Sequence, residues 1–139
     1  MIRDVIDLIK LHEGFSPRPY KCPAGAMTIG YGRNLDANGI TTAEGEVLLR
    51  NDLYAAISEL RMEPYWLDLS EVRQAVLSDM VFNLGWPRFS RFVKLREAVY
   101  QRDWDEAARQ MEQSKWYAQV GSRAKRLVGM MLTDQWPAA

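Results

Sequence analysis

Apolar side chains recur at helical spacing along much of the chain. The clearest stripe has intervals of four, three, one and three residues and consists of Leu49, Leu53, Ala56, Ile57 and Leu60. Those intervals place all five side chains on one face of a helix. Similar patterns predict further helices, which cover residues 2–12, 70–84, 88–100, 104–113 and 122–133. The chain is therefore predicted to be mostly helical.

Several of the predicted helices have a recognisable residue at one end. Gly14 is a stop signal for the first helix, and Pro64 is expected to end the central one. Thr41 and Glu44 have the Ser/Thr-x-x-Glu spacing of a capping box, so the central helix is expected to begin there. Asp103 is placed to cap the helix that follows it.

Between the first two helices the pattern changes. Residues 15–36 are rich in glycine and proline, and the stretch "AMTIGYGRNL" has the Thr, Ile and Tyr that strands favour. An Asn38-Gly39 turn follows. The predicted fold class is therefore α+β and mostly helical. It has a small N-terminal lobe with a β-hairpin or short sheet, a long connecting helix and a C-terminal helical lobe.

The charge is divided unevenly along the 139 residues. Residues 1–87 carry 8 Lys and Arg against 12 Asp and Glu, whereas residues 88–139 carry 10 against 6. An anionic partner for the second part is one interpretation, but a solvated charged surface is the favoured one for most of these residues. The zero net charge argues against a dedicated nucleic-acid-binding protein. One cysteine excludes an internal disulfide, and the charged N-terminal segment resembles neither a signal peptide nor a membrane span.

Two familiar sites are suggested by the sequence and then rejected. Residues 34–46 resemble a calcium-binding loop, but Gly45 occupies the position of the bidentate glutamate. His12 and Cys22 suggest a cysteine hydrolase, but successive helical residues point about 100° apart. If Glu13 faces the hairpin, His12 does not.

One histidine and one cysteine cannot by themselves form a zinc site. No metal or cofactor is expected.

Three residues of the Gly- and Pro-rich run carry a recognisable spacing. Glu13, Cys22 and Thr28 fit the pattern E-x8-[D/C]-x5-T, followed by "TIGYGRN". With "DMVFNLG" at 79–85 and the long segment 102–128, the chain resembles the phage-type lysozyme (endolysin) family. The resemblance covers nearly the whole chain. It implies a single lysozyme domain over 1–139, and it implies hydrolysis of the β-1,4 bond between N-acetylmuramic acid and N-acetylglucosamine in peptidoglycan. The lobes expected are 13–45, the connecting helix 46–64, and a helical lobe made of 1–12 and 65–139.

The resemblance assigns roles to the residues of the pattern. Glu13 is implied to be the general acid, and its place at a helix C-terminus, where unpaired carbonyls disfavour a negative charge, suits a proton donor. Cys22 stands where the family also has aspartate. A neutral thiol is a weak base, so a positioning role beside Thr28, which would orient a water molecule, is expected unless Lys21 or Arg33 lowers the thiol pKa. The implied outcome is inversion, and a covalent intermediate on Cys22 is the alternative.

Further residues match positions that the family uses around the substrate. Phe82 and Asn83 are implied to line the cleft, and Gln110 and Asn34 are implied to bind substrate as well. Arg123 matches the arginine that faces the catalytic glutamate. Trp104, Trp116 and Tyr117 are expected in the core.

The resemblance also implies a setting. The partner would be bacterial peptidoglycan, with no nucleic acid and no stable membrane insertion, and the protein would be a monomer. A phage endolysin without an export signal would stay in the host cytoplasm until it is released to the wall. Two alternatives remain open at this point: a lytic transglycosylase and a non-catalytic peptidoglycan-binding domain.

Overall fold

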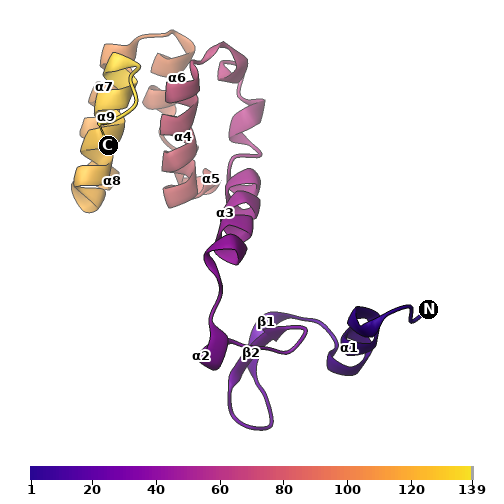
Figure 1. Ribbon diagram of the computed structural model, residues 1–139. Helices are drawn as coiled ribbons and strands as arrows, with labels where there is room; N and C mark the ends of the chain where they lie inside the picture. Colours follow the sequence, from indigo (N-terminus) through magenta and orange to yellow (C-terminus); the bar gives the residue numbers. More distant parts are fainter. Residues whose placement is uncertain (139) are drawn as a thin grey trace. The chain divides into compact units, whose positions relative to one another are not determined.

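The computed structural model describes residues 1–138, which form two compact units (Figure 1). The first unit is Met1–Leu48, and the second begins at Leu49. The expected division into lobes with boundaries at 13–45 and 46–64 stays a prediction. No helix of the described residues is long and apolar enough to cross a membrane.

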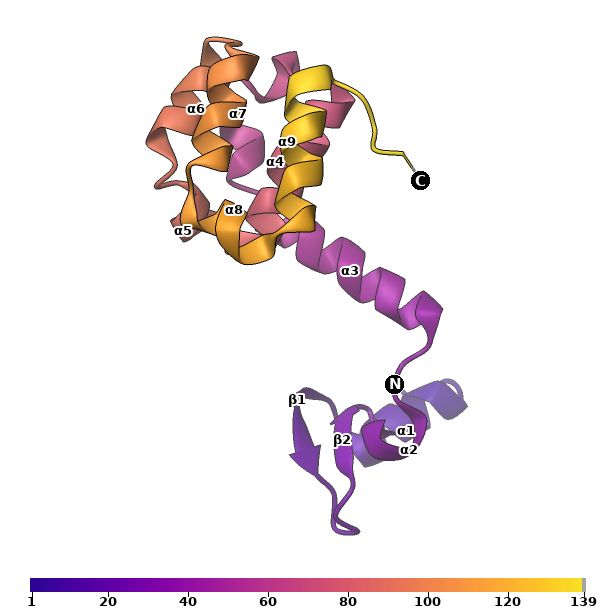
Figure 2. The same ribbon diagram turned by 90° about the vertical axis from the view of Figure 1, so that its left-hand side faces the viewer.

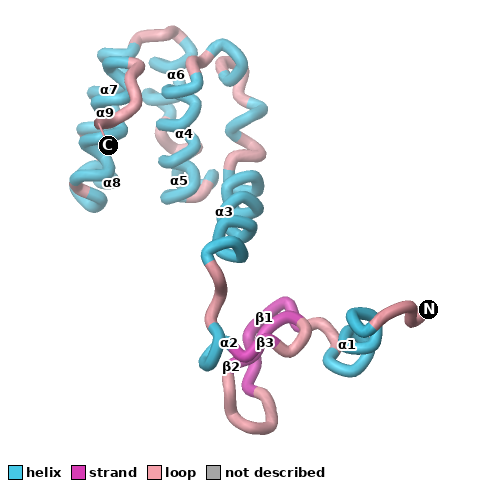
Figure 3. The backbone as a smooth tube through the Cα atoms, viewed as in Figure 1, coloured by secondary structure: helices cyan, strands magenta, loops and turns pink. Residues whose placement is uncertain are grey.

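The first unit consists of a helix, a small sheet and a second short helix. Helix α1 is Val5–Glu13, and α2 is Leu35–Asn38. Strands β1 (Ser16–Lys21), β2 (Met27–Gly30) and β3 (Arg33–Asn34) form an antiparallel sheet in the order β1-β2-β3 (Figure 3). The predicted α+β class is confirmed, and the predicted strand region contains all three strands.

Helix α1 ends where its sequence predicts. The Asp4 side chain accepts a hydrogen bond from the backbone N–H of Asp7 and so caps the first turn. Gly14 has a φ of 68°, and its N–H donates to the carbonyl of Lys10 at 2.9 Å. Glycine adopts this left-handed conformation without a steric penalty, which makes it a common helix terminator. Glu13 is thereby fixed as the last residue of the helix.

The central helix α3, Thr42–Ala56, begins at the predicted capping box. The Thr41 N–H donates to Glu44 Oε1 at 2.8 Å, and the Glu44 N–H donates to Thr41 Oγ1 at 3.1 Å. The prediction that the helix runs to Pro64 is wrong. The Ser58 hydroxyl donates a hydrogen bond to the carbonyl of Ala55 at 3.0 Å. This local bond competes with the backbone hydrogen bonds of a regular helix. The chain continues through a 3₁₀ turn that buries Leu60 completely.

The second unit is helical throughout. After two 3₁₀ turns, η1 (Leu60–Met62) and η2 (Trp66–Asp68), its helices are α4 (Glu71–Leu84), α5 (Trp86–Phe89), α6 (Val93–Tyr100), α7 (Trp104–Glu112), α8 (Lys115–Val120) and α9 (Ser122–Thr133). Helix α7 packs against both α6 and α9, and α4 packs against α9 and α5 (Figure 2). The helix predicted at 122–133 is confirmed, and α2 and α8 were not predicted.

The prediction of one helix over 88–100 is wrong, because the segment forms α5 and α6. Pro87 favours the first turn of a helix, so α5 begins directly after Gly85. The Ser90 hydroxyl then donates to the carbonyl of Pro87 at 2.9 Å, and the Arg96 guanidinium donates to the carbonyl of Ser90 at 2.9 Å. These side-chain bonds hold the break between the two helices.

One apolar core holds the second unit together. Its completely buried members come from nearly every helix and include Val76, Leu77, Met80, Val81, Phe89, Ala107, Met111, Ala124 and Met131. Trp116 is 3% exposed, and Trp104 and Tyr117 pack against the core from its edge. The expectation of a core position is confirmed for Trp116, whereas Trp104 and Tyr117 are only partly buried.

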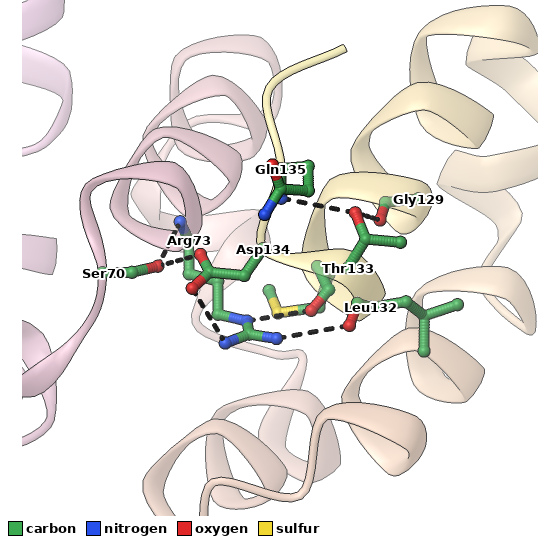
Figure 4. Close-up of polar contacts among 8 residues, drawn as sticks. Ser70, Arg73, Gly129, Leu132, Thr133, Asp134 and Gln135 are labelled. Atoms are coloured by element: carbon green, nitrogen blue, oxygen red, sulfur yellow. Dashed lines mark hydrogen bonds and ion pairs between the residues drawn. The ribbon is translucent and has the colours of Figure 1, made fainter.

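A buried arginine joins the start of α4 to the end of α9 (Figure 4). Arg73 Nε donates to the carbonyl of Met131 at 2.9 Å, and its Nη2 donates to the carbonyl of Leu132 at 3.3 Å. The guanidinium also lies 4.0 Å from the ring centroid of Trp104 and forms an ion pair with Asp134. Arg73 therefore satisfies backbone carbonyls that the end of α9 leaves without helical partners.

Arg73→Met should destabilise the protein by about 2–4 kcal/mol, because the buried carbonyls of α9 lose charged donors and Asp134 loses its ion-pair partner. Urea unfolding followed by circular dichroism measures the change. Arg109→Met is the matched control, since Arg109 forms an exposed ion pair with Glu106, and we expect a change of about 0.5 kcal/mol or less there. Equal losses in both variants would contradict this role of Arg73.

Candidate active site

The carboxylate of Glu13 lies against the turn between β2 and β3. Glu13 Oε2 is 2.8 Å from the position that a Cβ atom on Gly32 would occupy, and its Cδ is 3.0 Å from the same point. Gly32 has a φ of 83°, so the turn requires glycine both for its backbone conformation and for the space that the carboxylate fills. The sequence analysis did not single out Gly32, although the "TIGYGRN" stretch contains it. The exposed carboxylate of Glu13 can therefore meet a substrate while its position is limited by the turn.

Cys22 and Thr28 lie together at the loop end of the β1–β2 hairpin. The Cys22 N–H donates to the carbonyl of Ala26 at 2.9 Å, and the Gly25 N–H donates to the carbonyl of Cys22 at 2.8 Å. Thr28 is 4% exposed, and its hydroxyl donates to the same carbonyl of Ala26 at 2.9 Å. In the central strand β2, Thr28 pairs with Tyr20 on one side and Asn34 on the other. The sheet thus sets the position of the Thr28 side chain relative to Cys22.

The pKa of the Cys22 thiol is lowered from its ordinary value. The largest cause is hydrogen bonding to the backbone of Ala26; partial burial opposes it, and the backbone of Ala24 and the Thr28 hydroxyl lower the pKa further. Hydrogen bonds that stabilise a thiolate favour ionisation. Lys21 and Arg33 were the cations expected to lower this pKa, but the hairpin backbone provides the effect.

Arg33 is engaged elsewhere in the first unit. Its guanidinium donates to the carbonyl of Gly39 at 2.9 Å and to both carboxylate oxygens of Glu44, one of them at 2.9 Å. Arg33 and the capping hydrogen bond from Thr41 together lower the pKa of Glu44 to about 2. Arg33 therefore links the β3 strand to the start of α3 rather than lowering the pKa of the Cys22 thiol.

The Arg33–Glu44 ion pair should make the first unit sensitive to acid. A carboxyl whose pKa is depressed in the folded state stabilises that state above its unfolded pKa of about 4.5, and this contribution is lost as the pH falls through about 2. The midpoint of unfolding, measured at several pH values between 2 and 6, should therefore vary less with pH in Glu44→Gln than in the parent protein. Identical pH profiles for the two proteins would contradict the assignment.

Asn34 has a structural contact that the sequence analysis did not foresee. Its side-chain oxygen accepts a hydrogen bond from the Ala37 N–H at 2.9 Å and caps α2. Among residues 1–138 the NH₂ group of Asn34 has no hydrogen-bond partner, and the oxygen keeps a second lone pair. A substrate contact from Asn34 could therefore be donated or accepted, and its binding role stays a prediction.

The other expected binding residues belong to the second unit and lie in different surroundings. Phe82 is 39% exposed and lines a groove of about 530 Å³. Asn83 accepts a hydrogen bond from Trp116 Nε1 at 2.9 Å, which ties α8 to α4. Gln110 donates to Glu106 at 2.7 Å and lines another groove. Phe82 and Gln110 are therefore available to a ligand, while the side-chain oxygen of Asn83 holds the fold.

Arg123 lies in the same groove as Phe82 and forms an ion pair with Asp79, Nε to Oδ1 at 2.7 Å. Asp79 was not assigned a role from the sequence, and its place in "DMVFNLG" was the available signal. Trp136 also lines this groove and is 57% exposed. The role of Arg123 toward Glu13 stays a prediction.

Among residues 1–138, no group of three or more His, Cys, Asp or Glu side chains is arranged to hold a metal ion. What the described residues offer is acid–base chemistry: a carboxylate held by a turn, and a thiol of lowered pKa next to a threonine hydroxyl. A carboxylic acid can protonate a leaving group, and a hydroxyl or a thiolate can hold a water molecule.

Comparison with known proteins agrees with this chemistry. A family model described as phage lysozyme matches residues 10–131. The chain is 26% identical, in an alignment 163 positions long that covers 96% of both chains, to "Probable T4-type lysozyme 1" of Dictyostelium discoideum, and "Probable T4-type lysozyme 2" of that organism matches equally. The "Endolysin" of Acyrthosiphon pisum secondary endosymbiont phage 1 is 32% identical over 93 residues, covering 65% of this chain and 63% of the endolysin.

These similarities establish the class of the protein, which is a glycoside hydrolase that acts on bacterial peptidoglycan. More particularly, the chain belongs to the phage lysozyme family, whose model spans most of its length. The resemblance drawn from the spacing of Glu13, Cys22 and Thr28 is thereby confirmed at the level of the family.

Proposed function

We propose that the protein is a muramidase that hydrolyses the β-1,4 bond between N-acetylmuramic acid and N-acetylglucosamine, with Glu13 as the general acid. The observation that supports this most directly is the contact of the Glu13 carboxylate with Gly32. A general acid must reach the leaving oxygen with its proton, and a carboxylate limited by a rigid turn keeps the orientation that this transfer needs.

Thr28 and Cys22 are proposed to position the attacking water. The single proton of the Thr28 hydroxyl can be donated to the carbonyl of Ala26, as seen, or to the Cys22 thiolate. In either arrangement the oxygen of Thr28 keeps a lone pair that can accept a hydrogen bond from water. Since an ionised Cys22 also accepts hydrogen bonds, the pair can hold the water and add negative charge near an oxocarbenium-like transition state.

Attack by this water would invert the anomeric centre, because no covalent intermediate forms on the protein. Phe82, Gln110, Asn83 and Asn34 are proposed to bind the glycan, with Phe82 offering an apolar surface to a sugar ring. We further propose that Arg123 acts on Glu13, that the enzyme is a monomer, and that it waits in the host cytoplasm until it reaches the wall.

Mass spectrometry of digested peptidoglycan tests the proposed reaction. Reducing muramic acid ends are expected. Anhydromuramic ends would identify a lytic transglycosylase instead, since that reaction lets a hydroxyl of the sugar attack. Reducing glucosamine ends would place the cleavage at the other glycosidic bond, and the absence of cleavage would leave only a binding function.

Variants of Cys22 separate positioning of water from nucleophilic attack. Cys22→Asp should keep activity within about tenfold, because a carboxylate can hold the same water, whereas Cys22→Ala should lose about 10- to 100-fold. Iodoacetamide should inhibit the parent enzyme and leave Cys22→Asp unaffected. Wall lysis rates and NMR of fresh products provide the measurements. An inactive Cys22→Asp, together with a glycosyl adduct trapped on the parent thiol, would show that Cys22 is the nucleophile.

A further inference from the structure

Two adjoining grooves on the second unit carry the same kind of charge. The first has a volume of about 460 Å³ and is lined by Arg91, Phe92, Val93, Lys94, Leu95, Gln110, Gln113 and Ser114. The second has a volume of about 280 Å³ and is lined by Leu84, Arg88, Arg91, Phe92, Ser114, Lys115, Trp116 and Gln119. They share Arg91, Phe92 and Ser114, so they form one continuous surface, which we call the basic grooves.

The cations of the basic grooves form no ion pairs within residues 1–138, although Glu97 and Glu106 lie beside Lys94 in an adjoining pocket. No carboxylate lines either groove, and none of the four side chains forms an ion pair with another described residue; they are Arg88, Arg91, Lys94 and Lys115. Elsewhere in the second unit Arg96 pairs with Glu63, and Arg123 pairs with Asp79. The unpaired positive charge is therefore concentrated where a concave surface can receive a ligand.

The rest of the lining is mixed: apolar side chains such as Phe92 and Leu95 form part of it, and exposed amides beside them suit a chain with hydroxyl groups. Gln113 and Gln119 are exposed and have no side-chain hydrogen bond among the described residues, so both amides can donate and accept. Four cations spread over two joined grooves match a ligand that repeats its negative charge along its length. Guanidinium groups bind phosphate oxygens through paired hydrogen bonds, which favours phosphate diesters as the repeated group.

We propose that the basic grooves bind a phosphodiester-linked polyol polymer of the bacterial wall, such as teichoic acid, and so hold the enzyme on walls that carry it. This goes beyond hydrolysis of peptidoglycan, because the enzyme would bind the polymer without cleaving it. The inference does not depend on the mechanism assigned to Glu13, and the wall setting follows from the family's substrate.

The test measures binding to walls that are not being digested. Glu13→Gln protein is titrated with purified teichoic-acid-bearing walls and with the same walls stripped of phosphodiester polymer by hydrofluoric acid. The variant Arg88→Gln with Arg91→Gln removes two charges from the basic grooves. Its matched control is Lys125→Gln with Arg126→Gln, which removes two exposed charges of α9 that line neither groove. Both double variants are also made with Glu13 intact, and their folding is checked by circular dichroism.

Binding to the unstripped walls should fall about tenfold or more in the groove variant and less than about twofold in the control, as loss of two charge-assisted contacts predicts. With Glu13 intact, both variants should hydrolyse stripped walls at the parental rate. Failure of the parent enzyme to cleave stripped walls would count against the proposed reaction but would leave the binding result intact.

Four results would overturn the proposal. Equal losses in both double variants would mean that only net charge matters, and unchanged binding in the groove variant would remove the site. A similar loss on stripped walls would assign the grooves to the peptide carboxylates of peptidoglycan. Tighter binding to anionic lipid vesicles or to duplex DNA than to teichoic acid would assign them to another partner.

Discussion

Glu13→Gln should reduce wall lysis by about 10²- to 10⁴-fold or more, because glutamine has the shape of the glutamic acid side chain but cannot deliver a proton to the leaving group. Its amide can occupy the same space beside Gly32. The helix that carries it should remain intact, since the cap at Gly14 uses backbone atoms only. Turbidity loss of a wall suspension measures the rate.

Glu46→Gln serves as the control for removal of one carboxylate from the first unit. Glu46 is an exposed residue of α3, and its side chain forms no hydrogen bond or ion pair with residues 1–138. Lysis by Glu13→Gln within tenfold of the parent rate would exclude Glu13 as the general acid. We also expect the melting temperature of Glu13→Gln to be unchanged or raised, because groups placed for catalysis often cost stability. A clear fall in melting temperature would contradict this second expectation.

Gly32→Ala should reduce activity by about 10²-fold, measured at temperatures where the variant remains folded. The new methyl group would lie 2.8 Å from Glu13 Oε2, so the carboxylate must move. A flexible side chain moves at little cost in stability, but misplacement of a catalytic group by about 1 Å is enough for a loss of this size. The positive φ of Gly32 adds backbone strain of about 1–3 kcal/mol.

Gly30→Ala separates the two effects. Gly30 is in the same region and has a φ of 66°, but no atom lies within 4 Å of its added Cβ. Gly30→Ala should therefore lose about as much stability as Gly32→Ala but keep most of the activity. The measurements are thermal unfolding and the lysis rate of each variant below its melting range. Equal activity losses in both variants would mean that backbone strain, rather than contact with Glu13, determines the rate.

Short-range sequence signals predicted the structure well where both partners of an interaction lie within one turn. The capping box at Thr41 and Glu44, the stop at Gly14 and the cap at Asp103 are all present as expected. The error at the end of α3 has a different origin. The apolar stripe continues to Leu60, but a local Ser58 bond and complete burial of Leu60 replace the helix by a 3₁₀ turn. Periodicity indicates which side chains share a face. It settles neither their burial, since Leu49 is 52% exposed, nor the backbone conformation that places them there.

The candidate site shows the same difference between what the sequence predicts and what the tertiary structure adds. By itself the sequence determined which residues can carry the chemistry, because the spacing of Glu13, Cys22 and Thr28 is a property of the chain, and it determined the family. Only the tertiary structure decided that Gly32 limits Glu13, that backbone hydrogen bonds rather than a cation lower the pKa of Cys22, and that Arg123 pairs with Asp79. Each of these contacts depends on how strands and helices bring separate segments within a few ångströms. That proximity is set by packing and hydrogen bonding in three dimensions, and no local pattern of residue types encodes it.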